Sequence, residues 1–252
     1  SCESPKEVSP VYFNSITAEQ SGVDFENTLT PSADLNIIEY LYFYNGAGVA
    51  IGDLNNDGLE DLFVTGNQVQ DRVYENLGGL KFKDQTATAD INTQNSWSNG
   101  VTLADVNNDG LLDVYVSVVG NYKTLKGHNK LFLNQGDFKF KEISNEVHID
   151  FSGFGTQASF FDYDNDGDLD LYICRYYESD LNLSSEYRNV LMRTDGNFQF
   201  TDVTISSSTG IYTSASFQSI WFDWDRDGYQ DLFIIFLNKE VKLRGKMADE
   251  KY

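Results

Sequence analysis

A nine-residue acidic window occurs four times in the sequence, and it constrains the fold more than any other feature. Each copy has Asp at positions 1, 5 and 9, Asp or Asn at position 3, and Gly at position 6. The copies align without gaps and begin at Asp53, Asp105, Asp162 and Asp223. Self-similarity at a period of tens of residues is the signature of a repeat architecture. The chain is therefore expected to be an array of like units, each with one acidic loop.

The same succession of short apolar segments follows each window. An apolar run comes directly after the window, beginning at Leu62, Val114, Leu171 and Leu232. In the first three copies, a second run and a third, alternating run come next, and the third has Phe on one face, as in Phe138-Lys-Phe-Lys. With the strand that enters each window, a repeat amounts to four short antiparallel strands, which is the content of a propeller blade. The predicted fold is all-β, a β-propeller of four-stranded antiparallel blades with about four repeats, either complete or part of a larger propeller.

The repeat pattern also sets the expected domain limits. Residues 1–10 are expected to be an N-terminal tether, 11–238 the propeller, and 239–252 a charged C-terminal tail outside the repeat. The segment from Tyr12 to Val23 reads like the outer strand and exit of a blade. An N-terminal strand that completed the last blade would close a ring and hide the sheet edges.

The spacing of oxygen-bearing side chains in each window predicts a cation site. Side chains at positions 1, 3 and 5 of a tight loop converge on one point, and Gly at position 6 permits the positive φ that turns the chain. The carbonyl at position 7 and the carboxylate at position 9 complete an oxygen cage. Hard oxygen donors without His or Cys favour Ca²⁺, so the predicted cofactor is calcium at about four sites. The predicted ligands are Asp53, Asn55, Asp57, Leu59, Asp61, Asp105, Asn107, Asp109, Leu111, Asp113, Asp162, Asp164, Asp166, Asp168, Asp170, Asp223, Asp225, Asp227, Tyr229 and Asp231.

Two other kinds of loop resemble these windows. An EF-hand loop shares the first six positions, but it needs Glu at position 12 and flanking helices. Position 12 is instead occupied by Val64, Val116, Ile173 and Ile234, which excludes an EF-hand. The windows could also be ordinary Asp/Asn/Gly hairpin turns without a metal, but four copies in one register favour the cation site.

The formal charge of −21 fits concentrated cation sites better than a nucleic-acid partner. Of the 39 acidic residues, 16 lie in the four windows. Crowded carboxylates repel one another unless a cation lies among them. Phosphate binding needs Lys and Arg patches, which are not evident, so no nucleic-acid partner is expected.

The windows and the strands after them resemble the FG-GAP/VCBS repeats of calcium-binding β-propellers. Such repeats occur in the integrin α-subunit head and in bacterial secreted or surface proteins. The glycine-rich phrase from Tyr44 to Asp53 resembles the entry strand of these repeats, and the resemblance covers roughly residues 40–236. It implies four-stranded blades, calcium held between the first two strands, and ligands bound on the opposite face.

No catalytic motif is present, and the sequence predicts a protein that is not an enzyme. His128 and His148 lie in no motif, and nucleophile-elbow, zinc-protease and phosphate-loop signatures are missing. The predicted function is an extracytoplasmic binding or scaffold module for protein–protein interaction at the cell surface. The alternative is a lectin or carbohydrate-active enzyme with a glycan partner, since two acids on different blades leave no local trace. Candidate ligand contacts, which could equally pack between blades, are Trp97, Tyr122, Phe154, Tyr176, Tyr177 and Tyr187.

The two cysteines have different expected roles. They are far apart in sequence, which excludes a disulfide framework, and Cys174 lies in a strand-like run where a buried free thiol is expected. Cys2 precedes a polar stretch and resembles the start of a bacterial lipoprotein, although Ser1 argues against a processed form. The expected location is extracytoplasmic, as a secreted protein or a bacterial cell-surface or outer-membrane lipoprotein, and the only membrane contact would be a lipid at Cys2.

Overall fold

The protein is an all-β chain arranged as four antiparallel sheets. The computed structural model describes residues 13–176, 188–196, 198–210, 216–236 and 239–243. In these ranges the chain forms one short helix, α1 (Ala18–Ser21), and strands β1 to β15. The predicted fold class is confirmed, because each acidic window joins the first two strands of one sheet.

Each sheet has its strands in chain order, so neighbouring strands are joined by hairpins. The first sheet contains β1 (Val49–Gly52), β2 (Asp61–Val64), β3 (Arg72–Asn76) and β4 (Phe82–Asp84). The second contains β5 (Trp97–Ala104), β6 (Asp113–Val119), β7 (Lys130–Asn134) and β8 (Phe140–Glu142). The third contains β9 (Gly155–Phe161), β10 (Asp170–Arg175), β11 (Val190–Thr194) and β12 (Phe200–Asp202). The fourth contains β13 (Ser216–Phe222), β14 (Asp231–Phe236) and β15 (Lys239–Leu243).

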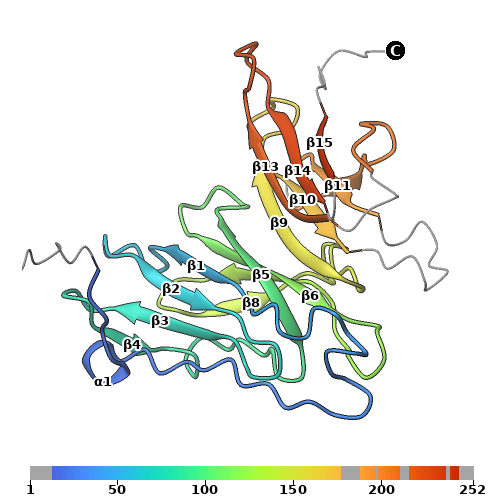
Figure 1. Cartoon of the computed structure of the whole chain (residues 1–252). Helices are drawn as coiled ribbons and strands as arrows, with labels where there is room; N and C mark the ends of the chain where they lie inside the picture. The colour runs from blue at the N-terminus through green and yellow to red at the C-terminus, as the bar shows by residue number, and fades with distance from the viewer. Residues whose placement is uncertain (1–12, 177–187, 197, 211–215, 237–238, 244–252) are drawn as a thin grey trace, which may run out of the picture.

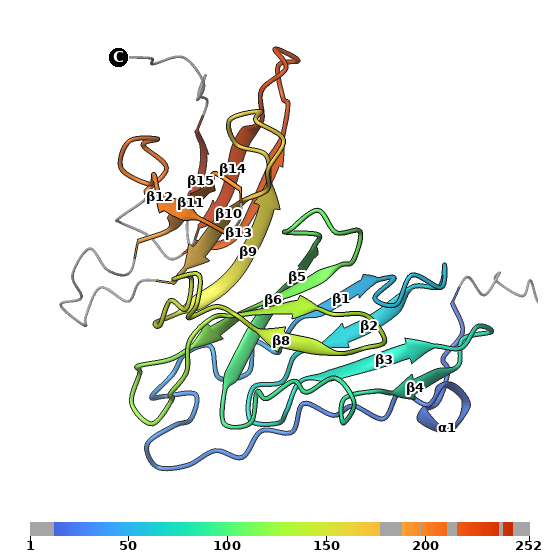
Figure 2. The ribbon, with the colours of Figure 1, turned by 180° about the vertical axis from the view of Figure 1, so that it is seen from behind.

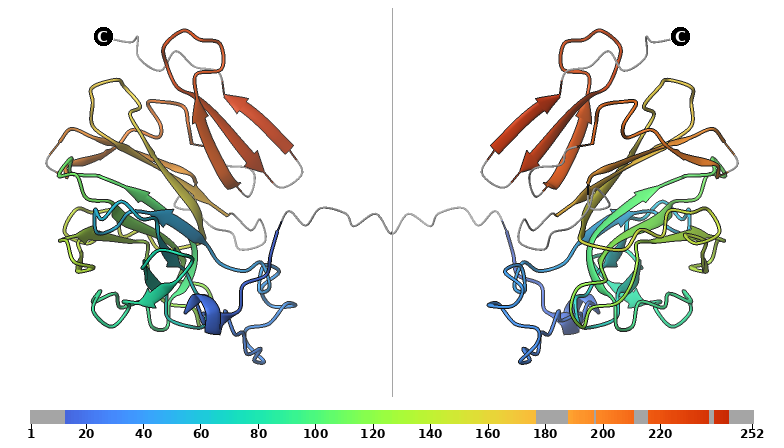
Figure 3. Two further views of the ribbon diagram at one scale, coloured as in Figure 1. Left: turned by 90° about the vertical axis from the view of Figure 1, so that its left-hand side faces the viewer. Right: turned by 90° about the vertical axis from the view of Figure 1, so that its right-hand side faces the viewer.

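The sheets follow one another along an arc, as the blades of a propeller do (Figures 1 and 2). The first strands of successive sheets are in contact, β1 with β5, β5 with β9, and β9 with β13. Hydroxyl groups join them, since Thr102 donates to the carbonyl of Ala158 at 2.6 Å and Thr156 donates to the carbonyl of Ser216 at 2.8 Å. Within the described residues the arc does not close into a ring (Figure 3).

Most of the hydrophobic core lies between neighbouring sheets rather than inside one layer. Between the first and second sheets, Phe63 and Val73 pack against Val116 and Phe132. The same arrangement recurs between the second and third sheets and between the third and fourth. Because a sheet buries its apolar face only against a neighbour, the sheets stabilise one another.

A buried Asp or Asn directly before the third strand adds a polar link between sheets. In the first sheet this residue is Asp71, which accepts hydrogen bonds from the main-chain N–H of Gly66 and from the hydroxyl of Ser98 in the next sheet. The equivalent residues are Asn129, whose side chain accepts the N–H of Val118 at 2.8 Å, and Asn189. This position was not among the predicted functional residues.

The N-terminal segment differs from the expected outer strand. Its described part forms no strand, and α1 begins after Thr17, whose side chain caps the helix. The segment lies at the first sheet, where Asp24 accepts a hydrogen bond from the hydroxyl of Tyr74 at 3.0 Å. It is therefore at the opposite end of the arc from the fourth sheet and does not complete that sheet in the same molecule (Figure 3).

The C-terminal region contributes one strand to the fourth sheet. Residues 239–243, which the sequence assigned to the tail, form β15 and pair with β14. No helix in the described ranges has both the length and the apolar character that crossing a bilayer requires.

Candidate cation-binding loops and the opposite end of the sheets

The four acidic loops share one backbone geometry. In each loop the Asp at position 1 accepts hydrogen bonds from the main-chain N–H groups of positions 5 and 6, as Asp53 does from Asp57 at 3.1 Å and from Gly58 at 2.7 Å. The glycine at position 6 has a positive φ in every loop, from 86° at Gly58 to 96° at Gly167. This confirms the turn that the sequence predicts at this glycine.

Position 4 also adopts a left-handed conformation, which the sequence analysis did not consider. Its φ is 59° at Asn56, 58° at Asn108, 60° at Asn165 and 62° at Arg226. Asn tolerates this region better than most residues with a side chain. The Asn at position 4 of the first three windows could therefore have predicted the left-handed conformation.

The third loop brings three carboxylates together. Asp162, Asp164 and Asp166 each offer an oxygen, and these oxygens lie within 4.8 Å of one another. One carboxylate oxygen of Asp164, Oδ1, is buried and has no hydrogen-bond partner. Burial, followed by the negative charge of Asp166, raises the pKa of Asp164 above its ordinary value. The fourth loop repeats the group with Asp223, Asp225 and Asp227.

The first two loops differ because position 3 is Asn rather than Asp. The side-chain amide of Asn55 donates to Oδ2 of Asp57 at 3.0 Å, and that of Asn107 donates to Oδ2 of Asp109 at 2.8 Å. An amide donor offsets part of the negative charge of the loop, which a third carboxylate cannot do. Positions 1, 3 and 5 of the third and fourth loops therefore carry three carboxylates, whereas those of the first and second loops carry two.

The Asp at position 9 ties each loop to its own sheet. In the third loop, Oδ2 of Asp170 accepts the N–H of Tyr163 at 2.6 Å and Oδ1 accepts the N–H of Thr194 at 2.7 Å. Asp61 and Asp113 accept the equivalent pairs of N–H groups. Burial raises the pKa of Asp170 to about 7 and that of Asp113 to about 6.

Position 9 was predicted only as a cation ligand, and the structure shows a further role for it. The carboxylates grouped within 4.8 Å in the third and fourth loops are those of positions 1, 3 and 5. At position 7, where the sequence predicts a carbonyl ligand, the N–H donates to the position 5 carboxylate. These residues are Leu59, Leu111, Asp168 and Tyr229.

An aromatic cluster lies at the opposite end of the first strands. Four of the predicted ligand contacts, Trp97, Tyr122, Phe154 and Tyr176, are buried in it, together with residues of the segment before β1 such as Tyr40 and Phe43. Packing accounts for most of their surface. Tyr177 and Tyr187, the other two, lie outside the described residues.

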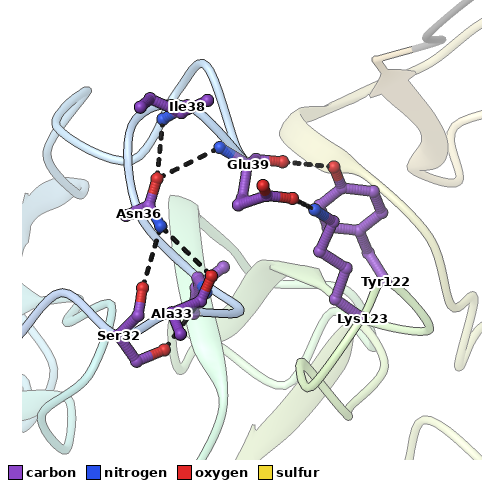
Figure 4. A network of polar contacts seen from close by, with 8 residues as sticks. Ser32, Ala33, Asn36, Ile38, Glu39, Tyr122 and Lys123 are labelled. Atoms are coloured by element: carbon purple, nitrogen blue, oxygen red, sulfur yellow. Dashed lines mark hydrogen bonds and ion pairs between the residues drawn. The ribbon is translucent and has the colours of Figure 1, made fainter.

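A polar network fixes the segment before β1 against the second sheet (Figure 4). The hydroxyl of Tyr122 donates to the main-chain carbonyl of Glu39, and Lys123 pairs with the carboxylate of Glu39. Oδ1 of Asn36 accepts the N–H groups of Ile38 and Glu39. This segment thus has a fixed conformation over the ends of the sheets.

A pocket of 210 Å³ opens beside the aromatic cluster. Its lining combines the starts of several first strands with aromatic side chains: Tyr42, Gly48, Gly100, Thr156, Tyr176 and Phe217. The hydroxyl of Tyr42 is buried and has no hydrogen-bond partner. Tyr40 and Tyr42 were not among the predicted contacts, although the aromatic-rich run from Tyr40 to Tyr44 is visible in the sequence.

Cys174 is buried, as expected, and burial raises the pKa of its thiol to about 12. A thiol of this kind is unreactive at neutral pH. Cys2, the predicted lipidation site, lies outside the described residues.

Comparisons with known proteins agree with the repeat geometry. The family model of the FG-GAP-like repeat matches residues 53–116 and 118–173. The chain is also similar to cartilage acidic protein 1. It is 28% identical to the Xenopus tropicalis protein over 144 residues, which is 56% of this chain and 21% of the relative. It is 28% identical to the Homo sapiens protein over 133 residues, or 52% of this chain and 19% of the relative, and to the Mus musculus protein over 130 residues, or 50% and 19%.

The alignments thus involve about a fifth of the length of these relatives. The first matched stretch contains the first and second acidic loops and the second contains the third loop, each with residues of the strand that follows it. This chain therefore contains two FG-GAP-like repeats, within residues 53–173.

Proposed function

We propose that this chain is a calcium-stabilised extracytoplasmic module for protein–protein interaction. The observation that carries the calcium assignment is the third loop, where three carboxylates converge and the buried Oδ1 of Asp164 has no partner. A buried carboxylate oxygen without a donor is unfavourable, and a divalent cation among the carboxylates would remove that cost.

The donor set suits calcium better than other biological metals. All side-chain donors at positions 1, 3, 5 and 9 are oxygens of Asp or Asn, without His or Cys. Oxygen ligands of this kind suit Ca²⁺, whereas zinc and copper favour nitrogen and sulfur. We expect positions 1, 3 and 5 to hold the ion through their side chains, with the carbonyl of position 7 and the carboxylate of position 9 completing the cage.

The four sites are not expected to be equal. A site with more anionic ligands binds Ca²⁺ more tightly. The third and fourth loops have Asp at position 3, whereas the first and second have Asn. The amide of this Asn donates a hydrogen bond to the carboxylate of Asp57 or Asp109 and so offsets part of its negative charge. The third and fourth sites should therefore fill at lower calcium concentrations.

Calorimetric titration and thermal unfolding test the calcium assignment. Each occupied site should add about 2.7 kcal/mol of stability at a hundredfold excess of calcium over Kd, so EDTA should lower the melting temperature markedly. Mg²⁺ at the same concentration serves as the control and should restore less of the lost stability. A melting curve that EDTA leaves unchanged would refute the assignment.

Two features support an interaction role outside the cytoplasm. The chain contains two FG-GAP-like repeats, and it is similar to a protein named for cartilage, a tissue rich in extracellular matrix. The carboxylates of the acidic loops accept main-chain hydrogen bonds or converge on one point within their loop. We therefore propose a role without catalysis. Affinity capture with the calcium-loaded chain tests this proposal. A specific partner should bind the folded chain and should not bind the unfolded chain.

A lipid anchor at Cys2, which would hold the protein at a bacterial membrane, is a more specific proposal about its location. Intact-mass analysis of the protein isolated from its native host would reveal a diacylglyceryl group on the N-terminal peptide. An unmodified Cys2 thiol would instead favour a secreted protein.

Carbohydrate binding is the second candidate, and the pocket beside Tyr42 favours it. The aromatic walls of the pocket are suited to the apolar face of a sugar ring. A glycan array combined with a hydrolysis assay distinguishes a lectin from an enzyme. Tyr42→Ala should weaken glycan binding about tenfold by removing one aromatic wall, whereas Tyr44→Ala, at an exposed position in the same segment, should not.

A further inference from the structure

The first acidic loop, residues 53–61, is in contact with the second, residues 105–113. The side-chain amide of Asn56, at position 4 of the first loop, donates to the main-chain carbonyl of Gly110, at position 6 of the second, at 2.9 Å. Leu54, at position 2 of the first loop, is fully buried in the core between the first two sheets, and Leu112 of the second loop packs against that core. The two loops therefore share a polar contact and an apolar one.

Asn134, the last residue of β7, forms a bridge between the same two loops. Its side-chain amide donates to the carbonyl of Leu54 at 2.8 Å and to the carbonyl of Leu112 at 3.0 Å. Its main-chain N–H donates to the carboxylate of Asp113, at position 9 of the second loop, at 2.8 Å. Asn134 is only 2% exposed, and burial strengthens such bonds. One buried side chain thus fixes a peptide group in each loop.

The bridged carbonyls lie next to the expected calcium ligands. Leu54 is between positions 1 and 3 of the first loop, which we expect to bind the ion through their side chains. Gly110 and Leu112 lie on either side of Leu111, whose carbonyl is the expected ligand at position 7 of the second loop. The amide bonds from Asn56 and Asn134 therefore leave these ligand oxygens free and act on the neighbouring peptide groups.

The residues equivalent to Asn134 in the first and third sheets form no such bridge. Asn76 and Thr194 end β3 and β11, and each donates its main-chain N–H to the position 9 carboxylate of its own loop, as Asn134 does. The amide of Asn76 donates to the carbonyl of Glu60 at 2.8 Å, which is again in its own loop. The hydroxyl of Thr194 is buried and has no hydrogen-bond partner. Among these three residues, bridging is specific to Asn134.

We propose that Asn134 is a positioning residue that makes the first and second loops bind calcium cooperatively. This inference rests on the calcium assignment proposed above. An ion in the first loop orders the peptide groups around Leu54 and Asn56, and the hydrogen bonds transmit this order to the second loop. The second ion then has fewer groups to order when it binds, so its affinity is higher. By linkage, an ion in the second loop raises the affinity of the first loop by the same factor.

Nuclear magnetic resonance of the 252-residue chain, in buffers of fixed free calcium concentration, reads each loop separately. The N–H of the position 6 glycine donates to the position 1 carboxylate in every loop, so its signal reports on the occupancy of its own loop. The midpoint of a loop is the free calcium concentration at which this signal has changed by half. We expect Gly58 and Gly110 to give similar midpoints, above the midpoint of Gly167 in the third loop.

Removing one ligand tests the coupling. Asp57→Ala deletes a carboxylate from the first loop, and it should raise the midpoint of Gly110 at least about fivefold while changing that of Gly167 less than about twofold. Asp109→Ala, the same change in the second loop, should raise the midpoint of Gly58 by the same factor as Asp57→Ala raises that of Gly110.

Asn134→Thr tests whether Asn134 carries the coupling. It introduces the residue that the third sheet has at this position, so it keeps the main-chain N–H and removes only the bridging amide. In this variant, adding Asp57→Ala should raise the midpoint of Gly110 less than about twofold. Asn76→Thr is the matched control, because it makes the same chemical change at a residue that bonds only within its own loop, and it should leave the coupling intact.

A second variant is available if circular dichroism shows that Asn134→Thr does not fold. Asn56→Gly removes the bond to Gly110 at an exposed position, and Gly adopts the φ of 59° without strain. It should lower the coupling factor at least about twofold.

The possible results distinguish a failure of the coupling from a failure of the calcium assignment. If the glycine signals respond to calcium but Asp57→Ala leaves the midpoint of Gly110 unchanged, the coupling is refuted and the calcium assignment stands. If the coupling is present and neither Asn134→Thr nor Asn56→Gly weakens it, the role of Asn134 is refuted. Signals of Gly58 and Gly110 that do not respond to calcium at all would refute both the assignment for these loops and the coupling.

Discussion

The side-chain amide of Asn189 donates a hydrogen bond to the hydroxyl of Ser216 at 2.9 Å, and this bond joins the third sheet to the fourth. The same amide donates to the hydroxyl of Tyr172 at 3.0 Å, and its Oδ1 accepts the main-chain N–H of Arg175 at 2.9 Å. One buried Asn therefore fixes the end of β10, the start of β11 and the first strand of the next sheet.

Replacing Asn189 should test how much this link stabilises the arc. Asn189→Ala removes a side-chain acceptor and two donor contacts in a buried site, and it should lower the free energy of unfolding by about 2–3 kcal/mol. Urea unfolding followed by circular dichroism measures the change. Asn145→Ala is the control, since Asn145 is exposed and its side-chain amide donates to the carboxylate of Asp150, and it should change stability by less than about 0.5 kcal/mol. Equal effects of the two variants would show that the link contributes little.

Asp71 occupies the position of Asn189 in the first sheet, and its charge should make stability depend on pH. Burial raises the pKa of Asp71 from 3.8 to about 7. The folded chain therefore keeps a proton that the unfolded chain releases, so the contribution of Asp71 to stability falls as pH rises from about 4 to about 7 and is constant above that.

Asp71→Asn should remove this dependence while keeping the hydrogen bonds. An amide can accept the N–H of Gly66 and donate to the hydroxyl of Ser98, as Asn189 does to Ser216. The variant should be more stable than the wild type by about 1–3 kcal/mol at pH 8, and the difference should shrink toward pH 5. Urea unfolding at a series of pH values measures it. A difference that does not vary with pH would contradict the prediction.

The sequence was sufficient to predict the repeat, the strand order and the turn at position 6 of each loop, because each of these follows from local patterns. The acidic window, the apolar run after it and the alternating Phe strand all recur in one register, so they define the sheet without knowledge of its neighbours. Gly58 and its equivalents signalled the positive φ for the same reason.

Contacts between sheets could not be predicted in the same way. The link from Asn189 to Ser216 spans 27 residues, and its importance depends on burial that no local pattern reveals. The aromatic candidates show the converse problem. Trp97 and Tyr122 were expected on an exposed ligand face or between blades, but the segment from Leu35 to Phe43 covers them. A segment outside the repeat leaves no trace in the repeat pattern.

Asp170 should stabilise the fold whether or not calcium is present. Both of its oxygens accept main-chain N–H groups, from Tyr163 and from Thr194. In Asp170→Asn one of these acceptors becomes an NH₂ group that faces another donor, so the free energy of unfolding should fall by about 1–3 kcal/mol both with calcium and with EDTA. Asp168→Asn makes the same chemical change in the same loop without removing such a pair of bonds. A loss confined to calcium-containing buffer would show that Asp170 acts only as a ligand.

Asp166 should stabilise the fold only when calcium is bound. Asp166→Ala removes one of three converging carboxylates, so in saturating calcium it should cost at least about 2 kcal/mol through weaker binding to the native state. In EDTA the same change removes one of several crowded negative charges, so the cost should vanish or reverse.

The control for Asp166 must be an Asp whose backbone tolerates Ala. Asp90 is exposed but has a φ of 53°, where Ala is strained, whereas Asp34 is exposed and does not have a positive φ. Asp34→Ala should change the free energy of unfolding by less than about 0.5 kcal/mol in either buffer. Thermal and urea unfolding of both variants, with calcium and with EDTA, complete the comparison. If calcium stabilises Asp166→Ala as much as it stabilises Asp34→Ala and the wild type, the third loop does not hold a cation through Asp166.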